Sequence, residues 1–203
     1  MQKYPNVTAG QTEAAINILG GWESFQKVLS GEILVTLTAK VKSILSLLGS
    51  VTFAATKKFV ARDNFRIGKA GIGWMGENFK NRFLGKTEEP APEATLRYHK
   101  LNESSLDGPI LAELGDKTET TLANLFSLLS LQTKGQSGIL LTNGYANIFY
   151  VRDAAGELRA VGADWRSGHG GWHVRAFTVT GPHGWRAGNQ VFSRNSCLPA
   201  GRS

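Results

Sequence analysis

The sequence predicts an α+β protein: an N-terminal helical hairpin with short strands, then a C-terminal antiparallel sheet packed on one helix. Apolar residues recur at helical spacing over residues 11–31 and 122–129. After residue 138, short runs rich in β-branched and aromatic residues alternate with turn-forming residues, which is typical of antiparallel strands. The chain has no regular strand–helix repeat, so a doubly wound parallel sheet is not expected.

Two short helices are expected over residues 11–31, separated by Gly20 and Gly21. Thr12 is placed to cap the first helix, and Gly31 to end the second. The apolar face of the second helix comprises Trp22, Phe25, Val28 and Leu29. Its remaining positions are Glu23, Ser24, Gln26 and Lys27. Such a polar face is poor at reading bases, so a packed helical hairpin is favoured over a DNA-binding helix-turn-helix.

A strand is predicted over Ile33–Thr38, which is rich in β-branched residues. Further along, Gly71-x-Gly73-x-x-Gly76 matches the dinucleotide-binding fingerprint. That fingerprint requires a preceding parallel strand, a following helix and an acidic residue about twenty positions later. Trp74 would also crowd a pyrophosphate, so we interpret the match as a coincidence.

Residues 88–95 are predicted to be an acidic, proline-containing linker. The surrounding segment, TEEPAPEATL, holds Pro90, Pro92 and three glutamates but no aromatic residue. Such a composition gives a stiff, solvated chain. The sequence therefore predicts a basic N-terminal region, 1–87, and a helix-plus-sheet domain, 96–203.

The second part is expected to begin with a strand at 96–101. It is followed by a helix that the capping pattern Asp116-x-x-Glu119 opens and whose apolar positions span 122–129. Further strands are predicted at 138–142, 145–152, 158–165, 172–179 and 190–194. Gly156 provides the positive φ that the hairpin turn after residue 152 requires. One face of this sheet is expected to pack on the helix. The other face is either exposed or covered in a two-layer core.

The composition excludes several classes of protein. The 203 residues include one cysteine, Cys197, so the chain forms no internal disulfide and no multi-cysteine metal site. Hydrophobic residues make up 41% of the chain, which is enough to bury a core. The longest apolar stretch, 33–55, is interrupted by Lys40 and Lys42, and the first residues lack the pattern of a secretory signal. We therefore expect a cytoplasmic protein that has no membrane partner and no cofactor.

The net charge of +7 is unevenly distributed. Residues 1–87 carry +7, residues 88–157 carry −5, and residues 158–203 carry +5. Lys134 is the last lysine, so the final block is basic through arginine alone. This block also contains three of the five tryptophans: Trp165, Trp172 and Trp185. Arginine binds phosphate through several donors and stacks on aromatic rings, so the pattern indicates a polyanionic partner, most simply DNA or RNA.

The candidate nucleic-acid-binding residues are arginine and aromatic side chains of the C-terminal sheet: Tyr150, Arg152, Arg159, Arg166, Trp172, Trp185, Arg186 and Arg194. On an exposed sheet face, such residues stack on bases and hold phosphates. The leading hypothesis is therefore a non-catalytic nucleic-acid-binding or nucleoprotein accessory protein. The simple alternative is that the aromatic residues form the core of a two-layer fold.

A second hypothesis is a small metal-independent nuclease or toxin. Its candidate catalytic residues are His173, Arg175, His169 and Asp164. Histidine serves as a general base near neutral pH, and arginine stabilises the charge of a pentavalent phosphate. The alternatives are surface histidines on a glycine-rich turn, or a zinc site formed by His169, His173, His183 and Asp164.

A third hypothesis is a protein-interaction module. The acidic block 88–157 has the charge to pair with the basic ends of the chain or with another protein. Association that weakens with salt is expected of such a module.

Five sequence segments, distributed along most of the chain, carry a family resemblance: WESFQKVLSGEI, KKFVARDNF, GWMGENFKNRFLGK, ILLTNGYANIFYVRDAAGELRAV and WRAGNQVFSRNS. Through them the chain resembles uncharacterised hypothetical proteins of uncultivated small-genome bacteria. The resemblance implies a bacterial cytoplasmic origin and a modular build. It implies no activity and transfers no catalytic residue.

Overall fold

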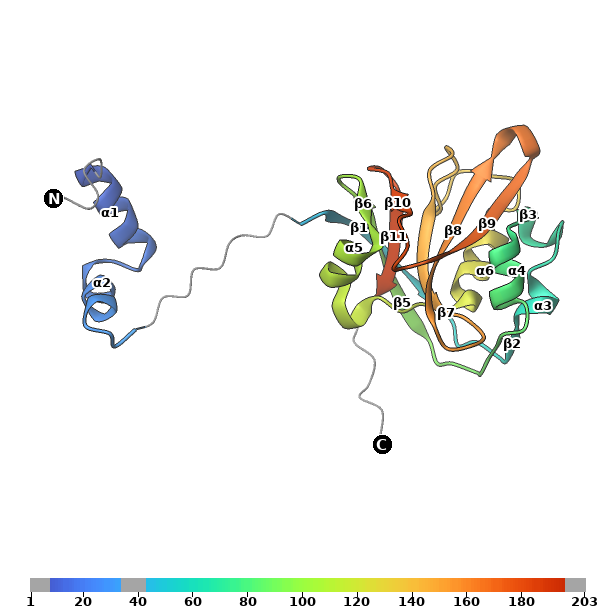
Figure 1. The fold of residues 1–203 in the computed structure, drawn as a ribbon, viewed down its shortest axis with the longest axis horizontal. Coiled ribbons are helices and arrows are strands. Elements are labelled where there is room, and N and C mark those ends of the chain that lie inside the picture. The colour runs from blue at the N-terminus through green and yellow to red at the C-terminus, as the bar shows by residue number, and fades with distance from the viewer. Residues whose placement is uncertain (1–7, 34–42, 196–203) are drawn as a thin grey trace. The chain divides into compact units, whose positions relative to one another are not determined.

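A computed structural model of the chain describes residues 8–33 and 43–195. Both helices and strands are present, which confirms the predicted α+β class (Figure 1). Two features of the sequence lie outside the described residues: the predicted strand Ile33–Thr38, from residue 34 onward, and Cys197. No helix in the described ranges is both long and apolar enough to cross a membrane.

The chain divides into two compact units, Met1–Lys42 and Ser43–Ser203. This division differs from the linker that the sequence suggested at 88–95. Strand β4 (Thr87–Glu88) begins that region and pairs with β2 (Phe59–Val60) within the second unit. The proline-containing segment is therefore a connection inside one unit.

In the first unit, α1 (Ala9–Ile18) and α2 (Trp22–Leu29) form the predicted helical hairpin. The first helix begins earlier than expected, because its N-cap is Thr8 and not Thr12. The Thr8 hydroxyl accepts a hydrogen bond from the Gln11 N–H, and the Gln11 side chain accepts one from the Thr8 N–H. This reciprocal capping box satisfies two backbone donors that would otherwise lack partners.

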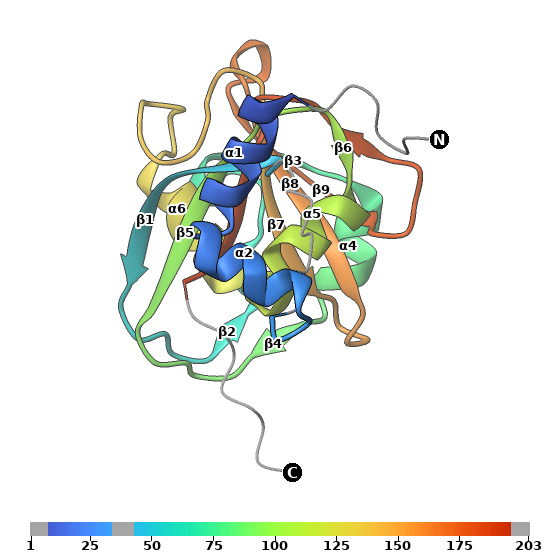
Figure 2. The ribbon, with the colours of Figure 1, turned by 90° about the vertical axis from the view of Figure 1, so that its left-hand side faces the viewer.

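The second unit contains a seven-stranded sheet in the order β1-β5-β11-β7-β8-β9-β3. Its strands are β1 (Leu45–Phe53), β3 (Ile72–Met75), β5 (Ala94–Leu101), β7 (Asn147–Arg152), β8 (Leu158–Arg166), β9 (Gly171–Thr178) and β11 (Gln190–Arg194). Strands β1 and β5 run side by side at one end of this order (Figure 2). The β7–β8 and β8–β9 pairs are antiparallel, as predicted, whereas β11–β7 and β3–β9 are parallel. The sheet is therefore mixed.

Other elements lie on both faces of the sheet. Helix α5 (Asp107–Leu114) and the pair β6 (Ser105–Leu106) and β10 (Gly184–Trp185) lie on one side (Figure 1). The helices on the other side are α3 (Ala61–Asn64), α4 (Glu77–Phe83) and α6 (Leu122–Leu131). Single 3-10 turns occur at η1 (Lys69–Gly71), η2 (Gly115–Lys117) and η3 (Ser167–His169).

Strand β7 is buried on both faces because each face packs in a separate core. Phe149 and Val151 belong to the larger core, which contains α6 residues, whereas Ile148 and Tyr150 belong to the smaller one beneath α5. Of the two alternatives for the second sheet face, covering by other elements is therefore the correct one at β7. Helix α5 was not predicted from the sequence, because its first turn contains Pro109, a residue that is typical of turns but is tolerated there.

The strand predicted at 138–142 is absent, because side-chain amides bind its backbone. The Gln132 amide accepts a hydrogen bond from the Leu140 N–H at 2.8 Å and donates one to the Leu140 carbonyl at 3.0 Å. The Asn147 amide binds Leu141 in the same two ways, at 2.8 and 3.1 Å. Since both amides lie in the interior, they satisfy backbone groups that a neighbouring strand would otherwise have to pair.

Helix α6 was predicted correctly, but its N-terminus differs from the expectation. Its N-cap is Thr121, and not Asp116 or Glu119. The Glu88 carboxylate also accepts hydrogen bonds from the first two N–H groups of the helix, at 2.9 and 3.0 Å. A negative charge is favourable at this end of a helix.

The glycines of the Gly71-x-Gly73-x-x-Gly76 pattern have a packing role. Gly71 has a φ of +73°, and a Cβ there would lie 2.3 Å from the carbonyl oxygen of Thr133. A Cβ on Gly171 would lie 2.7 Å from the Cα of Gly73. Gly73 therefore lets β3 lie close to β9, and Gly71 lets the turn before β3 lie against Thr133. These packing roles support the interpretation that the fingerprint match is a coincidence.

Candidate functional site

A row of side chains crosses the three strands β3, β9 and β8. Trp74 is the register partner of His173, and His173 is the register partner of Asp164. Because side chains alternate along a strand, Arg175 on β9 and Arg166 on β8 lie on the same face as this row. The sheet thus brings together charged and aromatic residues that are far apart in the sequence.

Asp164 is the centre of this group. Arg175 Nη2 lies 3.0 Å from Asp164 Oδ1, and Arg166 pairs with the other carboxylate oxygen. The Asp164 side chain is 8% exposed, whereas those of Arg175 and Arg166 are 36% and 45% exposed. A guanidinium has five N–H donors, so both arginines keep donors that a ligand can reach.

The two nearby histidines complete the set of predicted catalytic residues. The ring centroids of His169 and His173 lie 5.4 Å apart. Burial lowers the pKa of His173; Asp164 opposes this effect, and the neighbouring positive charges add to it. His173 is therefore neutral near pH 7. All four predicted catalytic residues lie in one neighbourhood.

Trp74 was not identified as a site residue from the sequence. Its side chain is 43% exposed, and the guanidinium carbon of Arg175 lies 5.9 Å from its ring centroid. A Cβ on Gly76 would lie 3.2 Å from the indole, so this glycine leaves room for the ring. The signal that the sequence offered was a tryptophan between two glycines in a basic segment.

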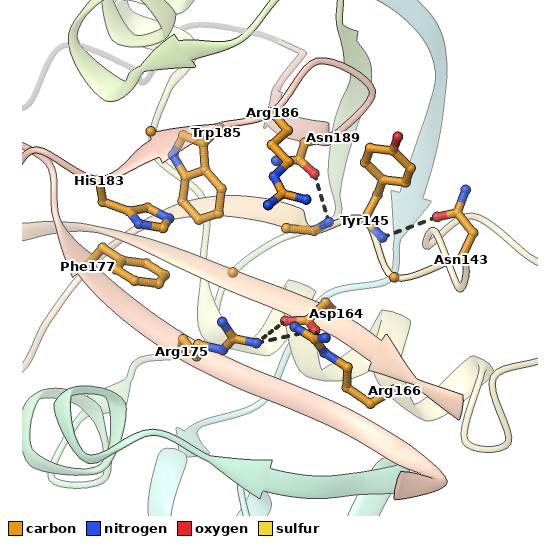
Figure 3. Close-up of a pocket in the computed structure, with 14 residues that line it drawn as sticks. Asn143, Tyr145, Asp164, Arg166, Arg175, Phe177, His183, Trp185, Arg186 and Asn189 are labelled. Carbon is orange, nitrogen blue, oxygen red and sulfur yellow. Dashed lines mark hydrogen bonds and ion pairs between the residues drawn. The ribbon is translucent and has the colours of Figure 1, made fainter. Parts of the chain in front are cut away.

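A pocket of about 510 Å³ lies next to this row (Figure 3). Figure 3 shows Arg166, Asp164 and Arg175 on one side of it, and His183, Trp185 and Arg186 on the opposite side. The pocket is therefore lined by three arginines from β8, β9 and the segment that follows β10.

Aromatic rings form one wall of the pocket. The Phe177 and His183 rings are stacked, with centroids 3.8 Å apart and an interplanar angle of 3°. Trp185 meets both rings edge-on, and its Nε1–H donates to Asp107 Oδ1 at 2.8 Å. A Cβ on Gly162 would lie 3.0 Å from the Trp185 ring, so a larger residue there would force this ring to move. These contacts fix the wall in place.

Amide and phenol groups line another part of the pocket. Tyr145 is 40% exposed, and its N–H donates to Asn143 Oδ1 at 3.3 Å. Asn189 Oδ1 accepts a hydrogen bond from the Ala146 N–H at 3.0 Å. The side-chain oxygens of Asn143 and Asn189 already accept these backbone hydrogen bonds. Their side-chain NH₂ groups are therefore the groups that can donate to a ligand. The lining is therefore rich in donors.

The predicted nucleic-acid-binding residues do not share one surface. Tyr150, Arg159 and Trp172 are buried. The Tyr150 hydroxyl donates to Asp107, and the Trp172 Nε1–H donates to the Gln132 carbonyl. These three side chains stabilise the fold and are not available for stacking or phosphate contacts.

The other predicted residues fall into two groups. Arg152 forms an ion pair with Glu119 at 2.9 Å, and Arg194 binds the Glu119 carbonyl, so both lie away from the pocket. The residues that line the pocket are Arg166, Trp185 and Arg186. Part of the pocket was therefore predicted from the sequence, whereas Phe177, Tyr145 and the two asparagines were not among the predicted binding residues.

The alternative of a zinc site is not supported. Among the residues that the structure describes, no three or more His, Cys, Asp or Glu side chains are arranged to hold a metal ion.

Comparison with known proteins found no matching family model, curated protein or solved structure. The resemblance to hypothetical bacterial proteins therefore stays a prediction. The features that bear on function are the row of residues across β3, β9 and β8 and the adjoining pocket.

Proposed function

We propose that the protein binds single-stranded nucleic acid, without catalysis, on the face formed by β3, β9 and β8. The observation that carries the proposal is the exposed indole of Trp74 beside the guanidinium of Arg175. An indole stacks on bases of any sequence, and an adjacent arginine binds the phosphate of the same strand.

The arrangement favours a single strand over a duplex. Stacking on Trp74 requires a base whose face is accessible, and a duplex hides these faces between neighbouring base pairs. Arg166 and Arg175 then provide two cations for the backbone, partly balanced by Asp164. We place this role in the bacterial cytoplasm, which the sequence resemblance implies.

A fluorescence-polarisation titration tests the proposal. The full chain is titrated into labelled single-stranded DNA and RNA of mixed sequence, at about 50 and about 200 mM salt. With two phosphate contacts, log K is expected to fall with log salt at a slope of about −1.4. Failure to bind either single strand at the lower salt concentration would falsify the proposal.

A second candidate function is metal-independent RNA cleavage, which the proximity of His169, His173 and Arg175 favours. Neutral His173 would take the proton of a ribose 2′-hydroxyl as its oxygen attacks phosphorus. The 5′-oxygen would leave with a proton from His169, while Arg175 stabilises the phosphorane charge. Incubation with RNA in EDTA tests this candidate. If the RNA is not cleaved, this candidate function is rejected. If His173→Ala cleaves RNA as fast as the parent protein, His173 is not the general base.

A further inference from the structure

The pocket beside the proposed binding face has more positive charge than a backbone phosphate needs. Arg166, Arg175 and Arg186 line it together with one carboxylate, that of Asp164, which leaves a net charge of +2. An internal phosphodiester carries one negative charge. A phosphomonoester carries close to two at neutral pH and has three oxygens free to accept hydrogen bonds. The pocket charge therefore matches a phosphomonoester.

The form of the pocket also suits a nucleotide. Its volume of about 510 Å³ lies within the range of small-molecule sites, which is roughly 300–1,000 Å³. The rings of Phe177, His183 and Trp185 supply an apolar wall, and the exposed Tyr145 ring supplies a further aromatic surface. Rings and donors in one pocket suit a ligand that has both a base and a phosphate.

Arg175 connects this pocket with the proposed binding face. Its guanidinium lies beside Trp74 and also lines the pocket. A strand whose bases stack on Trp74 can therefore reach the pocket with its end. We propose that the pocket binds the terminal phosphomonoester of a nucleic-acid strand, an inference that rests on the proposed single-strand binding.

Three oligonucleotides of one sequence, each with an internal label, test the inference: one with a 5′-phosphate, one with a 3′-phosphate and one with hydroxyl groups at both ends. We expect one phosphorylated form to bind about tenfold more tightly than the hydroxyl form. Arg186 is exposed, so Arg186→Ala is expected to fold, and it should reduce this ratio to near one. The matched control is Arg82→Ala, an exposed arginine on α4, which should keep the ratio.

Equal binding of all three oligonucleotides overturns the inference and leaves the proposed function standing. If no oligonucleotide binds, the proposed function fails, and calorimetric titration with adenosine monophosphate and adenosine decides about the pocket. Binding of the monophosphate alone, lost in Arg186→Ala, supports the phosphomonoester site and identifies a free nucleotide as its source. If neither compound binds, the pocket assignment is also overturned.

Discussion

Asp164 on β8 and Arg175 on β9 are joined across the two strands, with 3.0 Å between Oδ1 and Nη2. The carboxylate is nearly buried, while the guanidinium remains partly exposed. Asp164 therefore fixes the direction of Arg175 and at the same time reduces the positive charge that a bound phosphate meets.

Asp164→Asn is expected to strengthen nucleic-acid binding. The change keeps the size of the side chain and removes one negative charge, which is worth about 1 kcal/mol, or about fivefold in affinity. Polarisation titrations of the variant and the parent protein measure the difference. If the protein instead cleaves RNA, Asp164→Asn should lower the cleavage rate, because His173 loses the carboxylate that lies across from it. Weaker binding by Asp164→Asn would contradict the electrostatic argument.

Arg175→Ala is expected to weaken single-strand binding and to reduce the magnitude of the salt slope by about 0.7, the value of one phosphate contact. Affinities at several salt concentrations give this slope. Arg82→Ala removes the same charge from α4, which packs on the opposite face of the sheet, and should leave the slope unchanged. Equal slopes for the two variants would mean that binding reflects net charge alone.

Trp74→Ala is expected to lower the affinity by about 1–3 kcal/mol, the contribution of one base–aromatic stack. Because the indole is 43% exposed, Trp74→Ala should change the free energy of unfolding by less than it changes the free energy of binding. Quenching of tryptophan fluorescence by the nucleic acid should decrease in the variant. Trp22→Ala, at an exposed position of α2, is the control. Full quenching after Trp74→Ala would show that bases stack elsewhere.

Asp153→Ala is expected to reduce the free energy of unfolding by about 2–4 kcal/mol at pH 7. The Asp153 carboxylate accepts hydrogen bonds from the N–H groups of Ala155 and Glu157, at 2.9 and 3.0 Å. It also pairs with the buried Arg159 at 3.0 Å, so its removal leaves a buried charge with fewer partners. Urea denaturation measures the loss, and Glu157→Ala, which removes an exposed side chain, should cost less.

The pH dependence of the same variant gives a second check. Burial alone would raise the pKa of Asp153, but the hydrogen bonds from Arg159 and the two N–H groups outweigh it and hold the pKa below 3.8. The stabilisation by Asp153 is therefore complete above pH 3.8 and is lost as the pH falls through the lower, folded-state pKa. The difference in the free energy of unfolding between the parent protein and Asp153→Ala should therefore shrink as the pH falls below 3.8. A difference that stays constant in acid would contradict this assignment.

Tyr150→Phe is expected to reduce the free energy of unfolding by about 1.5–3 kcal/mol at pH 7, the range for a hydrogen bond to a charged group. The Tyr150 hydroxyl donates to Asp107 Oδ1 at 2.7 Å, in the core beneath α5. The other oxygen of Asp107 is buried and has no hydrogen-bond partner among the described residues. Tyr98→Phe on β5 controls for loss of a hydroxyl.

This effect should decrease in acid. Burial raises the pKa of Asp107, and the hydrogen bonds from Tyr150 and Trp185 partly oppose that rise. By itself, the raised pKa of Asp107 makes the fold most stable below pH 3.8 and less stable as the pH rises through the folded-state pKa. The effect of Tyr150→Phe runs in the other direction, because the Tyr150 hydrogen bond favours the ionised carboxylate and stabilises the fold less once Asp107 is protonated. Urea midpoints over this range measure it. A larger effect of Tyr150→Phe in acid than at pH 7 would contradict the assignment.

Local signals account for the parts of the fold that the sequence predicted. The hairpin of β7 and β8 follows from alternating residues on either side of a turn with Gly156, whose φ is +84°. The pair α1 and α2 follows from helical spacing around Gly20 and Gly21. In each case the residues that decide the structure are neighbours in the chain.

Distant partners account for the parts that were missed. The segment 138–142 has the composition of a strand, but Gln132 and Asn147 bind its backbone. Trp74 belongs to the candidate site because β3 pairs with β9, about a hundred residues further along the chain. Neither relationship leaves a periodic pattern in the sequence, so neither could be predicted from it.

The contact between Gly73 and Gly171 has a consequence for experiments that map function by mutation. Any side chain at Gly171 would push β3, which carries Trp74, away from β9, which carries Arg175. A saturation scan scored by binding would therefore rank both glycines with the residues that touch the ligand. A binding site defined by loss of function alone would thus include Gly73 and Gly171, although neither residue has a side chain that could contact the ligand.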